Sequence, residues 1–277
     1  MLTTRDKQIL EAIHACDGLL ADYQIKELFF TGARQARDRL MKLFHNGYLA
    51  RPSKRERASY PCMFYWLTER GADAVAGLQG VSLSELVWVA EPRWSKIEHD
   101  LLVNDFRLIL RNACLKNPEF ELKLWVNESV FNSDRDTVAY IGVDNTRRHR
   151  AIIPDGFCVV VRHTDRPFYS RLLLELDMAT EDNPRFAREK VLPGIAYLHS
   201  EIYVKRSGRN SGRWLVVTTG RRKMLNLKEA AERVAGDDAR VFYFTTFDQV
   251  NTETILTAPI WYPGGAKEPI ALFSEQM

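Results

Sequence analysis

The sequence predicts an α+β part followed by a larger α/β part, and three observations lead to this fold class. The chain has 277 residues, which is enough for one or two domains. Hydrophobic residues make up 45% and charged residues 27%, so the chain can fill a core and is not globally disordered. Residues 1–80 have mainly helical spacing, whereas later residues alternate helical segments with strongly apolar strands.

The first part begins with three predicted helices. Thr4 can cap the first helix, which Gly18 ends, and Asp22 can cap a short second helix. The turn Thr31–Gly32 opens the third helix, and Gly47 lies just past its end, where glycine is favoured. The apolar stripe of the third helix is predicted at Ala36, Leu40, Leu43 and Phe44.

A hairpin and a fourth helix complete the first part. Tyr48–Arg51 and Cys62–Leu67 are predicted strands that bracket a polar, basic tip at residues 52–60. A further helix then covers Ala72–Ala76. Three helices, with a tight turn before the third and a basic hairpin after it, are the order of a winged helix-turn-helix, which we expect over residues 1–80.

Positive charge is concentrated in this part of the chain. The whole chain has a net charge of only +3, but residues 31–60 contain eight Lys or Arg and two Asp or Glu, a net charge of +6. Side chains near the start of such a third helix reach base edges, and the other cations meet phosphates. The alternative is a solvated basic helix and loop. The expected DNA-contacting residues are Arg34, Gln35, Arg37, Arg39 and Lys42 on the third helix, and Arg55 and Arg57 in the hairpin tip.

The second part is expected over residues 93–250, after a linker at residues 81–92 and before an irregular tail at residues 251–277. Its helices and strands alternate in an order that predicts a central mixed sheet, with a polar hairpin at Asp134–Arg150. The predicted helices are Ile97–Leu115, Pro184–His199 (bent or split by Pro193) and Lys223–Ala235. The predicted strands are Phe120–Phe131, Ala151–Arg162, Phe168–Met178, Trp214–Thr219 and Arg240–Phe247.

Three carboxylates on two apolar strands are the best candidates for chemistry. Asp155 stands at the head of one strand, and Glu175 and Asp177 share one face of the next, because alternate side chains of a strand point the same way. Burial of a carboxylate is costly without a partner. One such partner is Mg²⁺ or Mn²⁺, held by Asp155 and Glu175, which would activate a water and stabilise charge on a phosphate. The alternative is ion pairing with bases of the following helix.

Several short segments, taken together, resemble one known family. The chain is similar to the replication-relaxation proteins of plasmids and mobile elements from residue 3 to around residue 220. The matching segments are Thr4–Asp6 with Ile9–Leu10, Leu67–Gly71, His99–Arg107, Ile153–Gly156, and Leu174–Asp177 with Thr180–Glu181. The resemblance implies a winged helix-turn-helix joined to a PD-(D/E)xK restriction-endonuclease-like domain of order αβββαβ. It also implies a role in handling DNA during plasmid replication or transfer.

The endonuclease pattern implies catalytic roles for Asp155 and Glu175, but this chain departs from it at Asp177, where the pattern has Lys. A carboxylate cannot supply the positive charge that stabilises the transition state. Either a base of the following helix substitutes, or the site binds metal or DNA without cutting. The candidate bases are Arg185, Arg188 and Lys190, and Lys190 completes the expected catalytic set.

The sequence therefore predicts a double-stranded DNA-binding protein that acts in plasmid or mobile-element replication or mobilisation, in DNA relaxation or its control. Its nuclease-like part is expected to be degenerate. A Mg²⁺- or Mn²⁺-dependent endonuclease or nickase is the first alternative, a winged-helix transcriptional regulator is the second, and a protein-interaction adaptor is the third. The expected partners are duplex DNA, a relaxase or replication proteins, and a second copy of the chain.

We expect a bacterial, cytoplasmic protein without a membrane segment. No apolar run approaches the roughly 20 residues of a membrane helix, and residues 1–7 do not resemble a signal peptide. The four cysteines lie far apart and form no CxxC pair, which fits a reducing compartment and argues against structural zinc or disulfides.

Two other charged groups have weaker expected roles. The basic runs Arg147–Arg150 and Lys205–Arg213 would flank bound DNA, or else form solvated loops. Glu98, His99 and Asp105 on the long helix would add a group to the carboxylate site, or else cap and ion-pair.

Overall fold

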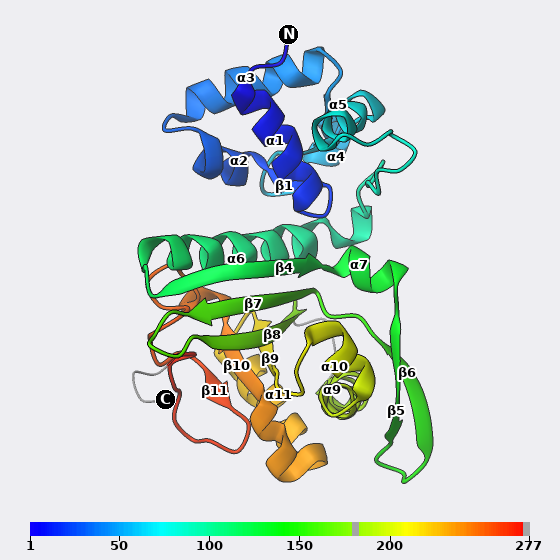
Figure 1. Cartoon of the computed structure of the whole chain (residues 1–277), viewed down its shortest axis with the longest axis vertical. Coiled ribbons are helices and arrows are strands. Elements are labelled where there is room, and N and C mark those ends of the chain that lie inside the picture. The colour runs from blue at the N-terminus through cyan, green and yellow to red at the C-terminus, as the bar shows by residue number, and fades with distance from the viewer. Residues whose placement is uncertain (179–182, 274–277) are drawn as a thin grey trace. The chain divides into compact units, whose positions relative to one another are not determined.

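The computed structural model describes residues 1–178 and 183–273, and the chain divides into two compact units (Figure 1). Unit 1 is Met1–Asp105 and unit 2 is Phe106–Met277. The boundary falls within the long helix α6, Ile97–Lys116. Thr180 and Glu181, which belong to the matching segments, lie outside the described residues. In the described part of the chain, no helix has both the length and the apolar character needed to cross a membrane.

Unit 1 combines short helices with a small antiparallel sheet. Its helices are α1 (Thr4–Ala15), α2 (Asp22–Phe29), α3 (Ala33–His45), α4 (Lys54–Arg57) and α5 (Glu69–Gln79). Its strands are β1 (Leu19–Ala21), β2 (Leu49–Ala50) and β3 (Phe64–Leu67), in the sheet order β1-β3-β2. The predicted helices and hairpin are present. Strand β1 is an addition to the prediction, because three residues are too few for a period of two to be visible in the sequence.

Helix α1 begins at Thr4, but the residue before it is the cap. The Thr3 hydroxyl accepts a hydrogen bond from the Asp6 backbone N–H at 3.3 Å, and the Asp6 carboxylate accepts one from the Thr3 N–H at 2.7 Å. This reciprocal pair is a capping box. The predicted cap Thr4 is therefore wrong by one position, because only Thr3 has a carboxylate at the third helical position after it.

The hairpin tip is more ordered than the predicted polar loop. It contains the single helical turn α4, which a second capping box begins. The Ser53 hydroxyl accepts from the Glu56 N–H at 3.3 Å, and the Glu56 carboxylate accepts from the Ser53 N–H at 2.7 Å. The capping box sets the position of the basic residues Lys54 and Arg55, which stand in the first turn of α4.

The apolar faces of the helices form the core of unit 1. Three residues of the predicted stripe on α3, Ala36, Leu40 and Leu43, are buried, and the two leucines belong to one cluster with side chains such as Ile9 of α1. Phe44 is only half-buried, and the Arg51 guanidinium lies over its ring at 4.3 Å. Gly47 follows α3 with a left-handed φ of 70°, as predicted.

Unit 2 is built around a six-stranded mixed sheet, which confirms the predicted central mixed sheet (Figure 1). Its strands β8, β9 and β10 are parallel, and the other neighbouring pairs are antiparallel. In sheet order the strands are β11 (Tyr262–Pro263), β10 (Phe242–Thr246), β9 (Arg213–Thr218), β8 (Phe168–Asp177), β7 (Gly156–Arg162) and β4 (Phe120–Asn127). A separate two-stranded sheet joins β5 (Asp136–Ile141) to β6 (Arg147–Ile152), which is the predicted polar hairpin.

Helices cover the sheet of unit 2. After the second half of α6 come α7 (Glu128–Ser133), α8 (Asn183–Phe186), a π-helical turn (Ala187–Val191), α9 (Leu192–Leu198), α10 (Glu201–Ser207) and α11 (Arg221–Ala235). Side chains of α8 to α11 pack on the sheet face that carries Leu173, Val216 and Phe244. The π-helical turn ends two residues before Pro193, which has no backbone N–H to donate and so disturbs the helical ladder at the predicted place.

Four predicted boundaries in unit 2 differ from the structure. The strand predicted to reach Phe131 ends at Asn127, because α7 follows it. The strand predicted over 151–162 is divided between β6 and β7, with Pro154 in the gap, since proline cannot donate to a ladder. The basic loop predicted over 205–213 begins as helix α10. The tail supplies strand β11 and packs into the core, where Ile255 and Trp261 are fully buried.

Candidate nucleic-acid interface and carboxylate cluster

Helix α3 presents one apolar and one polar face. With 3.6 residues per turn, the face opposite the buried stripe carries Arg34, Asp38, Met41 and His45, and Gln35 and Lys42 lie beside it. The Arg34 side chain is 93% exposed and lies 3.8 Å from Asp38, which at such exposure is a weak ion pair. Gln35, Arg37 and Lys42 are also exposed. Four of the five predicted contact residues on this helix are therefore accessible.

Arg39 is the exception on α3, because its guanidinium is held inside unit 1. It donates to both carboxylate oxygens of Asp6 and to the Thr3 hydroxyl at 3.2 Å. Asp6 is fully buried, and burial raises the pKa of its carboxyl, but the hydrogen bonds from Arg39 and Thr3 outweigh this and lower that pKa. Arg39 therefore joins α3 to α1, and it does not lie on the accessible face with Arg34.

The hairpin lies beside α3. The Arg51 guanidinium, at the end of β2, contacts the Met41 sulfur at 3.0 Å as well as the Phe44 ring. Helix α4, at the hairpin tip, carries Lys54 and Arg55, which are both exposed. Arg57 is half-buried, and it donates to the Tyr60 carbonyl, so it contributes to the fold of the tip itself.

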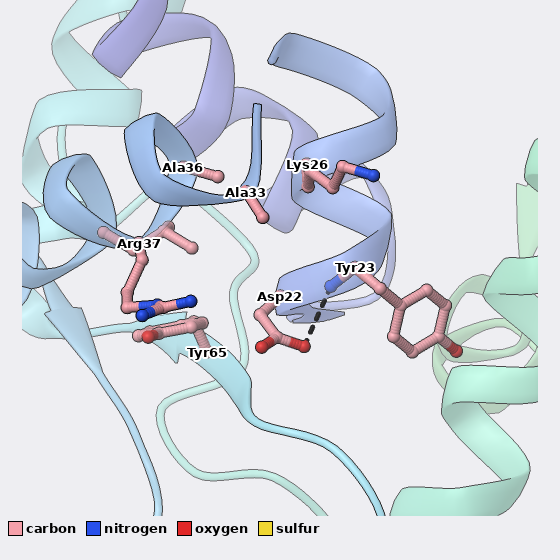
Figure 2. A pocket seen from close by; sticks show the side chains of 8 residues that line it. Asp22, Tyr23, Lys26, Ala33, Ala36, Arg37 and Tyr65 are labelled. Atoms are coloured by element: carbon pink, nitrogen blue, oxygen red, sulfur yellow. Dashed lines mark hydrogen bonds between the residues drawn. The ribbon is translucent and has the colours of Figure 1, made fainter. Parts of the chain in front are cut away.

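A hollow of about 190 Å³ opens between α2, α3 and β3 (Figure 2). Arg37 extends from α3 to lie next to Tyr65, and Lys26 of α2 lines another side. Asp22 faces the hollow too, and its carboxylate accepts a hydrogen bond from the Tyr23 N–H at 2.9 Å. Burial raises the pKa of Tyr65. Arg37 therefore lines a hollow of mixed character, which also contains the apolar side chains of Ala36 and Leu40.

Unpaired positive charge remains on this surface. In the described part of the chain, none of the side chains of Arg37, Lys42, Lys54 and Arg55 has an ion-pair or hydrogen-bond partner. We call the exposed bases of α3 and α4 (Arg34, Arg37, Lys42, Lys54 and Arg55) the basic surface. Its cations attract a polyanion without first having to leave another strong partner.

In unit 2, strand β8 carries two of the predicted carboxylates on one face, as the alternation predicts. Glu175 and Asp177 share the face of Leu173, which α8 to α11 cover, and both are buried. The alternate residues Leu172, Leu174 and Leu176 are buried as well. Both faces of this strand are therefore covered, and the two carboxylates need partners inside unit 2.

Lys190, the predicted base, meets Glu175. Its ammonium lies 2.7 Å from one carboxylate oxygen of Glu175 and 2.9 Å from the other. Lys190 belongs to the π-helical turn, which adds one residue to the turn before Pro193. The other two predicted bases are directed elsewhere. Arg185 pairs with Glu189 at 3.2 Å, and Arg188 is exposed.

Asp177 has a different partner, which the sequence reasoning missed. Lys223, in the first turn of α11, lies 3.6 Å from Asp177, and the Thr218 hydroxyl donates to the same carboxylate at 3.2 Å. Lys223 also donates to the Asn183 amide oxygen at 3.1 Å. The topology explains this partner, because β9 runs parallel to β8 and the helix after β9 begins at the edge of the sheet where Asp177 ends β8.

Asp155 stands directly before β7 and is buried. Its N–H donates to the Leu174 carbonyl at 2.9 Å, and its carboxylate accepts from the Leu176 N–H at 2.7 Å. The side chain thus continues the ladder between β7 and β8 beyond Pro154. Over residues 1–178 and 183–273, no group of three or more His, Cys, Asp or Glu side chains is arranged to hold a metal ion.

The remaining predicted charged residues mainly have partners in their own unit. Asp105 accepts hydrogen bonds from Gln24 at 2.7 Å and from the Tyr23 hydroxyl at 2.8 Å, and burial raises its pKa. His99 lies 3.2 Å from Asp100. In the basic run 205–213, Arg206 pairs with Asp134 and Asp136. These residues therefore stabilise the fold around them.

Comparison with known proteins gives one match. The family model described as replication-relaxation matches residues 11–211, which is more than half of the chain. No curated protein and no solved structure matches the chain.

Proposed function

The chain belongs to the replication-relaxation family, and from this premise we propose that it binds double-stranded DNA through the basic surface of unit 1. Family membership supports a role in replication or relaxation broadly. The proposal adds that this role is exercised on plasmid or mobile-element DNA, with a relaxase or replication proteins and a second copy of the chain as further partners.

The single observation that carries the proposal is the unpaired charge on α3 and α4. Exposed cations that are already ion-paired contribute little to a new partner, but four bases here have no side-chain partner in the described residues. The order of elements in unit 1, with α2, the turn at Gly32, α3 and then the β2–β3 hairpin, supports the proposal of a winged helix-turn-helix. That arrangement supports α3 as the helix that enters the major groove.

The two halves of the basic surface have different expected tasks. Arg34 and Gln35 stand in the first turn of α3, from which side chains reach base edges, and Arg37 follows one turn later. Lys54 and Arg55 are point contacts for phosphate on the hairpin tip. Removal of the α3 residues should therefore reduce sequence selectivity, and removal of the hairpin residues should weaken all duplexes equally.

Duplex binding by the full chain tests the proposal. A labelled duplex is titrated with protein at several salt concentrations, and its fluorescence anisotropy gives Kd. We expect Arg34→Ala with Arg37→Ala to weaken binding by roughly 10- to 100-fold, and to reduce the slope of log K against log salt by about 0.9 for each phosphate that is no longer neutralised. The matched control is Lys116→Ala with Lys267→Ala, which removes the same charge from exposed positions of unit 2.

Two results would contradict the proposal. Absence of salt-dependent binding to any duplex removes the DNA-binding function itself. Equal weakening by the α3 pair and by the control pair would mean that only the net charge matters, and that the basic surface is not a specific contact.

A second candidate function, a metal-dependent endonuclease or nickase, is favoured by the buried Glu175–Lys190 and Asp177–Lys223 pairs. Buried carboxylates beside lysines are a common arrangement in active sites. The oxygen ligands of Asp155 and Glu175 suit Mg²⁺ or Mn²⁺ in kind. In this arrangement, however, Lys190 contacts both oxygens of Glu175, so a cation must displace its ammonium before Glu175 can act as a ligand.

Nicking of supercoiled plasmid in the presence of Mg²⁺ or Mn²⁺ tests this candidate. An enzyme should lose about 100-fold or more of its nicking rate in Asp155→Ala and in Glu175→Ala. Asp248→Ala, which removes an exposed carboxylate from the end of β10, should keep the rate. Clean protein that never nicks, or nicking that survives both substitutions, rejects the candidate.

A further inference from the structure

Unit 2 carries a projecting β-ribbon that the proposed function does not use. Strands β5 and β6 form a sheet of their own, and in Figure 1 this ribbon runs along one side of unit 2, next to α9 and α10. Each strand has six residues, so the ribbon is roughly 20 Å long. We call β5, β6 and their turn the ribbon.

One face of the ribbon is fixed to unit 2. Val138 and Ile152 are buried in its core, and the Asp136 carboxylate accepts a hydrogen bond from the Tyr197 hydroxyl at 2.5 Å. Arg206 donates to the same carboxylate, and Arg150 pairs with Glu189 at 2.7 Å. The base of the ribbon is therefore firmly held, and its inner charges are paired.

The turn of the ribbon is also internally paired. Asp144 accepts from the N–H and the hydroxyl of Thr146, at 3.3 Å and 2.7 Å, and it pairs with Arg148 at 2.6 Å. These hydrogen bonds, with Thr146 contributing most, lower the pKa of Asp144 to about 2. Both acids of the ribbon, Asp136 and Asp144, are thus neutralised by arginines.

The outer face of the ribbon is different. The register places Arg147 opposite Ile141, and His149 opposite Ala139, with all four exposed to solvent. Within the described residues, the side chains of Arg147 and His149 have no hydrogen-bond or ion-pair partner. The outer face therefore carries the positive charge of Arg147, with the apolar side chains of Ile141 and Ala139 on the neighbouring strand and no acid.

We propose that this outer face is a second DNA contact, and that the ribbon lies in a groove of duplex DNA with Arg147 against the backbone. The major groove admits a two-stranded ribbon, and the small side chains at Ala139 and Ala151 let its backbone approach the bases closely. Paired acids and an unpaired arginine make the face complementary to a polyanion. This inference rests on the proposed DNA-binding function and extends it to unit 2.

The test uses the full chain and the same anisotropy titration. Arg147→Glu should weaken duplex binding by roughly 10-fold or more and reduce the salt slope by about 0.9. Lys267→Glu makes the same change of charge at an exposed position whose side chain also has no partner in the described chain, and it should leave Kd within about twofold. Ala139→Glu adds an acid to the outer face while Arg147 and His149 stay in place, so it should weaken binding as well. Circular dichroism confirms that each variant is folded.

The pattern of results separates the two proposals. Weakening by Arg147→Glu and Ala139→Glu but not by Lys267→Glu supports the ribbon contact. If the α3 pair weakens binding and the ribbon variants match Lys267→Glu, the ribbon contact is wrong and the basic surface stands. If the ribbon variants weaken binding and the α3 pair matches its control, the contact lies on the ribbon and not on α3. If the unmodified chain binds no duplex, both proposals fail.

Discussion

At the scale of single residues, the arginines of α3 show that neighbours decide what a side chain does. Arg34 and Arg39 differ by five positions on one helix, yet Arg34 is almost fully exposed while Arg39 is bound to a buried carboxylate. The helical spacing placed both among the expected DNA contacts, because it cannot identify a partner on another helix. That partner, Asp6, is also the residue that completes the cap of α1.

The Asp6–Arg39 pair predicts that the conservative substitution Asp6→Asn strongly lowers the stability of the protein. Asp6→Asn removes the charge that holds Arg39 and weakens the capping box, so we expect a decrease of about 2–3 kcal/mol in the free energy of unfolding. Urea denaturation monitored by circular dichroism measures it. Asp38→Asn is the matched control, since it removes an exposed carboxylate 3.8 Å from Arg34 and should change stability by no more than about 0.5 kcal/mol.

The same pair also predicts a dependence on pH. The pKa of Asp6 in the folded protein lies below its ordinary value of 3.8, so its stabilisation is complete above that value and is lost as the pH falls through the folded pKa. Asn does not titrate. The stability difference between the unmodified protein and Asp6→Asn should therefore be full at pH 7 and shrink at pH 3. A difference that stays constant across this range would show that the carboxylate acts through packing alone.

At the scale of elements, Gly71 determines how α5 packs on the hairpin. It stands in the first turn of α5, and a Cβ atom built on it would lie 2.1 Å from the Tyr48 backbone oxygen. The same Tyr48 oxygen accepts a hydrogen bond from the Thr68 backbone N–H. Only a residue without a side chain allows the helix and the start of the hairpin to come so close.

A pair of glycine substitutions in α5 tests this. Gly71→Ala should lower the unfolding free energy by about 2 kcal/mol or more, because backbone must move to admit the methyl group. Gly77→Ala lies in the same helix, with nothing within 4 Å of the added Cβ, and should raise stability by about 0.5–1 kcal/mol. Thermal unfolding of both variants gives the comparison. Equal and small shifts would mean that the close approach at Gly71 relaxes freely.

The elements that could be predicted are those with a local signal. The apolar stripe of α3, the glycine after it and the polar hairpin of unit 2 all follow from spacing and turn residues. Strand β1 could not be predicted, because it is defined by its register with β3, where Leu20 pairs with Tyr65 far along the chain. Helix α4 is predictable in principle, since Ser53 and Glu56 have the spacing of a capping box, but it is too short to show a periodicity.

At the scale of the whole chain, part of the candidate site follows from sequence and part from topology. Alternation along β8 is enough to place Glu175 and Asp177 on one face, and the sequence indicates Lys190 as a base of the next helix. The partner of Asp177 could not be found this way, because Lys223 reaches it only through the parallel pairing of β8 with β9. The hydrogen bonds of Asp155 to Leu174 and Leu176 likewise depend on the register of β7 with β8, which the sequence alone does not give.

The net charge of +3 does not show how the charges are distributed along the chain. It conceals a basic stretch at residues 31–60 and, in unit 2, acids that are individually neutralised, such as Asp136 by Arg206 and Asp144 by Arg148. The first proposal uses the exposed bases of α3 and α4, and the second uses Arg147 on the outer face of the ribbon. The side chains of these bases mainly have no partner among the described residues.

The order of the six-stranded sheet has a consequence for how the protein is made. From β4 to β11, each strand pairs with the one that precedes it in that sheet along the chain. A growing polypeptide that leaves the ribosome therefore adds each new strand at the free edge of those already synthesised, and no strand has to be inserted between two others. Unit 2 can assemble in the direction of translation, with β11 as the last strand to close the edge.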